Sequence, residues 1–106
     1  MASSAFERFR FSFFEDAYSW HDGLDLAAVA ELAGEERTRA EEMLIRYLPD
    51  FRAVIGLGEL RSRSAERQLA QLFEAERRAG GGPKLVYLAK ALWQIRPDPR
   101  WPGRLR

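Results

Sequence analysis

The only histidine of the chain, His21, lies beside a carboxylate in the sequence Trp20-His21-Asp22. A histidine held by a carboxylate can act as a general acid or base, which requires a pocket and a reacting group within hydrogen-bond reach. Adjacent residues in a turn point in different directions, and Asp22-Gly23 is typical of a turn. We therefore interpret His21 as a structural or surface residue, and we predict no catalytic residue and no enzyme.

A cluster of carboxylates is the second group that could do chemistry, by binding a metal or by acting as an acid/base pair. It consists of Glu35, Glu36, Glu41 and Glu42. Arg37, Arg39 and Arg46 alternate with these carboxylates, a pattern that favours a solvated helix face. The absence of cysteine excludes thiolate nucleophiles and cysteine-rich zinc sites. We predict no metal site and no cofactor.

Three arginines, Arg61, Arg63 and Arg67, form the third candidate, a basic patch that could bind the phosphates of a nucleic acid. Glu59 and Glu66 dilute this patch, and 17 basic against 16 acidic residues give the chain a net charge of only +1. Nucleic-acid-binding domains are usually much more basic. Binding of nucleic acid through the patch is therefore our alternative hypothesis, and steep salt dependence would distinguish it.

Two glycine motifs do not match phosphate-binding loops. Gly56-x-Gly58 lies inside an expected helix, and the glycines at 80–82 lack the Gly-Lys-Ser/Thr ending and the preceding strand. We expect close helix packing at the first motif and a flexible turn at the second.

The elements that must position these residues are all helices. The first segment is ambiguous, because Phe9, Phe11 and Phe13 alternate as in a strand. A helical stripe explains more residues, namely Phe6, Phe9, Phe13, Ala17 and Trp20. Ser4 and Glu7 also form a capping box. We predict a helix over residues 5–19, whose second aromatic face is either core or interface.

Caps and helix breakers delimit five further helices. A short one follows a cap at Asp22 or Asp25 and is closed by Gly34, and the next begins with Glu35 and Glu36 in its first turn. Pro49 and Asp50 separate it from the following helix, Ser62 or Ser64 caps a longer one, and Pro83 starts the last. The expected inward-facing residues include Leu26, Tyr47, Phe51 and Trp93.

Two stretches of the chain resemble each other. Residues 40–48 read AEEMLIRYL and residues 65–73 read AERQLAQLF, 25 residues further on. Residues 56–61 read GLGELR and residues 91–96 read ALWQIR, at an offset of 35. Short connections between such helices favour antiparallel hairpins. The sequence thus predicts an all-α fold in which about six helices stack as a short α-solenoid of antiparallel hairpins.

Residues 39–61 and 83–98 resemble bacterial HEAT-repeat proteins, and the likeness covers about residues 34–98. It implies one helical-repeat domain over residues 1–98. Aromatic capping helices at 1–33 would precede hairpins at 34–61 and 62–96, and an irregular Pro/Arg-rich tail at 97–106 would follow.

The resemblance also implies a stack of hairpins that binds other macromolecules, usually without catalysis, through the second helix of each hairpin. We predict a non-enzymatic module whose partner is another protein or a second copy. The expected contact residues are Arg52, Glu59, Tyr87, Lys90, Gln94 and Trp101. By analogy, an immunity or antitoxin protein or an adaptor fits this size and architecture. We see neither a secretory signal nor the ~18-residue apolar run of a membrane span, which predicts a cytoplasmic protein and no membrane partner.

Overall fold

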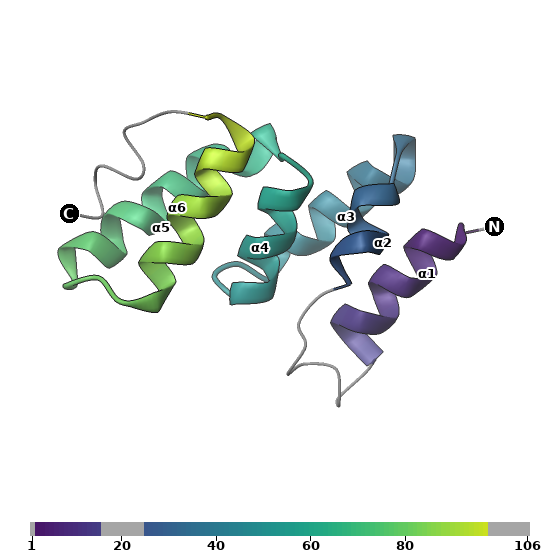
Figure 1. The fold of residues 1–106 in the computed structure, drawn as a ribbon, viewed down its shortest axis with the longest axis horizontal. Helices are drawn as coiled ribbons and strands as arrows, with labels where there is room; N and C mark the ends of the chain where they lie inside the picture. Colours follow the sequence, from purple (N-terminus) through teal and green to yellow (C-terminus); the bar gives the residue numbers. More distant parts are fainter. Residues whose placement is uncertain (1, 16–24, 98–106) are drawn as a thin grey trace.

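The structure, a computed structural model, describes residues 2–15 and 25–97, with the side chains of residues 14 and 15 excepted. These residues form six α-helices and no strand, so the all-α prediction is confirmed. The helices are α1 (Ser4–Arg10), α2 (Leu26–Glu31), α3 (Gly34–Arg46), α4 (Phe51–Glu59), α5 (Glu66–Arg78) and α6 (Pro83–Ile95). They follow one another along a body of 44 × 29 × 20 Å, with α1 at one end and α5 and α6 at the other (Figure 1).

The first helix starts one residue earlier than predicted. Ser3, not Ser4, is its N-cap, and the Ser3 hydroxyl accepts a hydrogen bond from the backbone N–H of Phe6 at 3.1 Å. The α-helix ends at Arg10 and continues as a π-helical segment, η1 (Phe11–Glu15). The predicted remainder, residues 16–19, lies outside the described residues. The predicted stripe of Phe6, Phe9 and Phe13 is buried, so this face of the segment is core.

Local capping explains where the other helices begin. Of the alternatives left open by the sequence, Asp25 caps α2, and Ser62 caps the short 3₁₀ segment η3 (Arg63–Ala65) that leads into α5. Asp50 caps α4 as predicted, and Pro83 occupies the first turn of α6. The short helix α2 ends at Glu31, so Gly34 does not close it and instead opens α3.

The interior is assembled around α4, which packs against α2, α3 and α6, while α5 packs against α6 and α1 against α2. The predicted helix pairs 34–61 and 62–96 are therefore in contact. Helices α4 and α6 lie side by side in the same direction. Gly58 makes this approach possible, because a Cβ atom there would lie 2.8 Å from the Cα of Ala91. The predicted close packing at Gly58 is confirmed.

Four side chains expected to point inward are exposed, which corrects the prediction. Leu26 and Phe51 are the first residues of their helices and lie at the rim of the core. Tyr47 follows the end of α3 and is half exposed, and its ring meets the Phe13 ring at an interplanar angle of 80°. Trp93 is 49% exposed, because the buried arc of α6 is already filled by smaller apolar side chains. The buried residues of α6 are Leu85, Leu88, Ala89, Ala91, Leu92 and Ile95. None of the helices in the described residues has the length and apolar character needed to cross a bilayer.

Candidate functional site

Four of the predicted contact residues lie together on the surface formed by α4 and α6. Tyr87, Lys90 and Gln94 are spaced three and four residues apart on α6 and so share one face of that helix. Gln94 donates a hydrogen bond from Nε2 to the Glu59 Oε2 atom of α4 at 3.3 Å. We call this surface, together with Phe51, the α4–α6 face.

The α4–α6 face carries a pair of partly exposed aromatic rings. The ring centroids of Phe51 and Tyr87 are 6.1 Å apart with an interplanar angle of 36°, and each residue is 40% exposed. They border a hollow whose other lining residues are Pro49, Val54, Leu72, Glu76, Lys84 and Leu88. The hollow encloses only about 20 Å³, room for about one water molecule. A drug-sized ligand needs a cavity of ~300 Å³ or more, so this geometry suits contact with a macromolecular surface.

Opposite charges flank the aromatic pair. Lys84 and Glu76 both line the hollow, yet neither forms an ion pair with any described residue. Lys84 and Lys90 are the only lysines of the chain, and both are exposed on α6, three residues before and after Tyr87. The apolar centre is therefore flanked by charges of both signs that form no ion pair within the described part of the chain.

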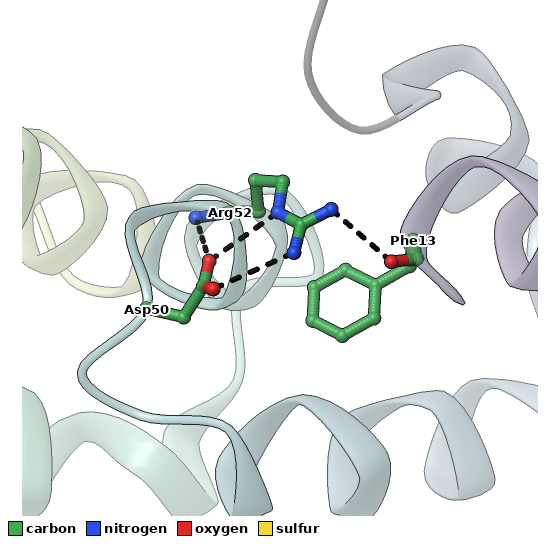
Figure 2. Close-up of polar contacts among 3 residues, drawn as sticks. All are labelled: Phe13, Asp50 and Arg52. Atoms are coloured by element: carbon green, nitrogen blue, oxygen red, sulfur yellow. Dashed lines mark hydrogen bonds and ion pairs between the residues drawn. The ribbon is translucent and has the colours of Figure 1, made fainter. Parts of the chain in front are cut away.

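Arg52, a predicted partner-contact residue, instead binds two residues of its own chain, Phe13 and Asp50 (Figure 2). Its Nη1 atom donates to the backbone carbonyl of Phe13 at 3.1 Å, and its Nε atom donates to Oδ1 of Asp50 at 3.4 Å. The guanidinium carbon lies 4.8 Å from the centroid of the Phe13 ring. Arg52 thus connects the start of α4 to the N-terminal segment. Trp101, the last predicted contact residue, lies outside the described residues.

The arginine patch lies in and after the connection between α4 and α5. Arg61, Arg63 and Arg67 are exposed, and none forms an ion pair with a described residue. The neighbouring carboxylate of Glu66 forms an ion pair with Arg96, whose Nη2 lies 3.1 Å from Glu66 Oε1. The patch is therefore less diluted by acidic residues than the sequence suggests.

The acidic cluster on α3 forms no metal-binding constellation among the described residues. Glu35 and Glu36 lie in the first turn of the helix as predicted. Hydrogen bonds from Ser3 hold the pKa of Glu36 below its usual value. The larger effect comes from the Ser3 side chain and the smaller from its backbone N–H, which donates to Glu36 Oε2 at 2.8 Å. The positive charge of Arg39 lowers this pKa as well. Glu36 thus helps to tie the start of the chain to α3. His21 lies outside the described residues.

The sequence did not identify Phe51 as a member of the α4–α6 face, or Glu76 and Lys84 as charged residues of the adjoining hollow. Phe51 looked like a core residue by its apolar character, but its position directly after the Asp50 cap places it at a helix end. No local pattern marks Glu76 and Lys84, which belong to different helices and are brought to the same hollow by the packing of those helices.

The chain matches no protein-family model, no curated protein and no solved structure. The resemblance to HEAT-repeat proteins therefore stays a prediction.

Proposed function

We propose that this protein is a non-enzymatic interaction module that binds another protein chain through the α4–α6 face. The solenoid of hairpins predicted from the sequence belongs to this proposal, with α4 and α6 as the second helices of successive hairpins. Their parallel contact supports that arrangement. A partner would bind to a rigid platform made of two packed helices.

The observation that carries the proposal is the exposed contact between Phe51 and Tyr87. Aromatic side chains are enriched in the centres of protein interfaces, where they bury a large area with little loss of conformational freedom. Here the ring of Phe51 on α4 contacts the ring of Tyr87 on α6, with their centroids 6.1 Å apart. Exposed charges and a hydrogen-bonded pair, Glu59 and Gln94, lie around them. An apolar centre with a polar rim is the usual anatomy of a protein interface.

Affinity capture with matched baits tests the proposal. The baits are the wild-type chain, Tyr87→Ser and Trp93→Ser, incubated at moderate salt with a lysate of the source organism and analysed by mass spectrometry. Trp93 is a suitable control because it is an exposed aromatic residue of the same helix that does not line the hollow beside Tyr87. We expect a protein that is retained in stoichiometric amounts by the wild type and by Trp93→Ser but lost with Tyr87→Ser.

If no captured protein depends on Tyr87, the α4–α6 face is not the interaction surface and the proposal is wrong. If one protein does, its identity distinguishes a toxin-blocking role from an adaptor role.

A second candidate function is nucleic-acid binding through the arginine patch. It is favoured by the exposure of Arg61, Arg63 and Arg67 and by the pairing of Glu66 with Arg96. DNA binding measured at two salt concentrations tests it. A steep loss of affinity with salt, together with a weaker salt dependence in Arg63→Gln, would support this function over protein binding.

A further inference from the structure

We infer that the partner of the α4–α6 face is a second copy of this chain, docked about a twofold axis that passes by the Phe51–Tyr87 pair. The inference rests on the proposed function and names the partner of the same surface. A twofold interface uses the same patch on both copies, so the patch must be complementary to itself. The apolar centre and the charges of the α4–α6 face each meet this requirement.

The charges are self-complementary. Lys84 of α6 and Glu76 of α5 line the same hollow without forming an ion pair with a described residue. About a twofold axis, Lys84 of each copy can face Glu76 of the other, which gives two equivalent pairs per dimer. The net charge of +1 creates little long-range repulsion between copies.

Partners with a strong charge of one sign fit this face less well. An acidic segment would be attracted by Lys84 and Lys90 but would also meet Glu59 and Glu76. A basic segment would meet the two lysines. Like charges brought together in an interface weaken binding and exclude wrong partners. A second copy presents both signs and can place each one opposite its complement.

The apolar centre is also compatible with a dimer. Phe51 and Tyr87 border a shallow hollow lined by the apolar side chains of Val54, Leu72 and Leu88, and the rings of the other copy can pack over these side chains.

The test is a measurement of oligomeric state on the full chain by sedimentation velocity and light scattering over a range of concentrations. The proteins are the wild type, Lys84→Glu and Glu76→Lys. Each variant places two like-charged pairs in a homodimer where the wild type has two opposite pairs. We expect a concentration-dependent dimer for the wild type and dimer dissociation constants raised on the order of tenfold in each variant.

Mixing the two variants provides the decisive control. In the mixed dimer, the carboxylate introduced at position 84 faces the ammonium introduced at position 76, and the native Glu76 faces the native Lys84. Dimerisation is therefore restored in the equimolar mixture although neither variant dimerises well alone. A folding defect would not be repaired by mixing, and circular dichroism of each variant checks that the helices are intact.

A wild type that stays monomeric at all concentrations would overturn the inference, as would a dimer that both variants and their mixture leave unchanged. A monomer that still captures a different protein in a Tyr87-dependent way would leave the proposed function standing and refute only the choice of partner. A monomer without such capture would refute both.

Discussion

The guanidinium group of Arg52 lies 4.8 Å from the centroid of the Phe13 ring and donates a hydrogen bond to the Phe13 backbone carbonyl at 3.1 Å (Figure 2). The two residues are separated by 39 positions in the sequence. Phe13 belongs to the π-helical segment η1, and Arg52, in the first turn of α4, reaches back to it. This contact links the N-terminal helices to α4, the helix that forms half of the α4–α6 face.

Replacing Arg52 with methionine is expected to destabilise the fold. The change removes the hydrogen bond to the Phe13 carbonyl and the cation–π contact, while the Asp50 side chain still caps α4 through the backbone N–H of residue 52. The combined loss is about 1–3 kcal/mol. Urea unfolding measures it. Arg52→Lys keeps the positive charge but not the planar fork, so it restores the stability only in part. A loss below about 0.5 kcal/mol in Arg52→Met would contradict this role.

Gly58→Ala tests the packing of α4 on α6. Alanine is the better helix former by about 1 kcal/mol, so helix propensity alone predicts a more stable protein. A Cβ at this position would lie 2.8 Å from the Cα and 2.9 Å from the Cβ of Ala91. Because the Cα belongs to the backbone, the two helices must move apart, and overpacking typically costs about 1–3 kcal/mol. We expect a net loss of stability in thermal and urea unfolding.

The double variant Gly58→Ala, Ala91→Gly serves as the control for this prediction. It removes one of the two close contacts with residue 91. Its loss of unfolding free energy is therefore expected to be smaller than the sum of the losses in the two single variants. A more stable Gly58→Ala protein would show that α4 and α6 separate freely.

The helices could be predicted from the sequence because their limits depend on local chemistry. Asp50 and Ser62 accept hydrogen bonds from backbone N–H groups two and three residues further on, and Pro83 suits the first turn of a helix. The offset of 35 between residues 56–61 and 91–96 is also the spacing of Glu59 and Gln94, which are hydrogen-bonded in the structure. Similar sequence positions in the two segments therefore lie beside each other.

The candidate site could be predicted only in part, because exposure and pairing depend on how helices cross. Tyr87, Lys90 and Gln94 follow from helical spacing on one element. The partial exposure of Phe51 and the presence of Glu76 and Lys84 in the lining of one hollow depend on the packing of three helices. The contact between Arg52 and Phe13 joins residues that are 39 positions apart, and no local sequence pattern predicts it.

Arg61→Gly is expected to stabilise the fold. Arg61 follows the end of α4 with φ of 54°, in the left-handed region. This conformation costs a residue with a Cβ about 1–2 kcal/mol, whereas glycine adopts it readily and is the usual residue at this position after a helix. Part of the gain is offset by the greater freedom of glycine in the unfolded chain, which leaves a net gain of about 0.5–1 kcal/mol. Thermal unfolding measures the gain as a higher melting temperature.

The comparison with Arg63→Gly separates conformation from charge. It removes the same positive charge, but residue 63 has no positive φ, so no gain is expected there. Equal stabilisation by both variants would attribute the effect to reduced repulsion among the arginines.

Acidification is expected to weaken the contact between Ser3 and Glu36. Hydrogen bonds from Ser3 lower the pKa of Glu36 in the folded protein below its ordinary value of 4.5. The unfolded chain therefore binds the proton more readily than the folded one, so this carboxylate stabilises the fold above about pH 4.5. That stabilisation is lost as the pH falls through the lower pKa of the folded state.

Glu36→Gln carries no such titrating group, so the wild type is the more stable protein at pH 7, and the difference in stability shrinks as the pH is lowered to 3. Urea unfolding at both values measures it, with Glu42→Gln, an exposed carboxylate of the same helix, as the control. A difference between wild type and Glu36→Gln that does not change with pH would mean that the charge of Glu36 plays no part in holding Ser3 against α3.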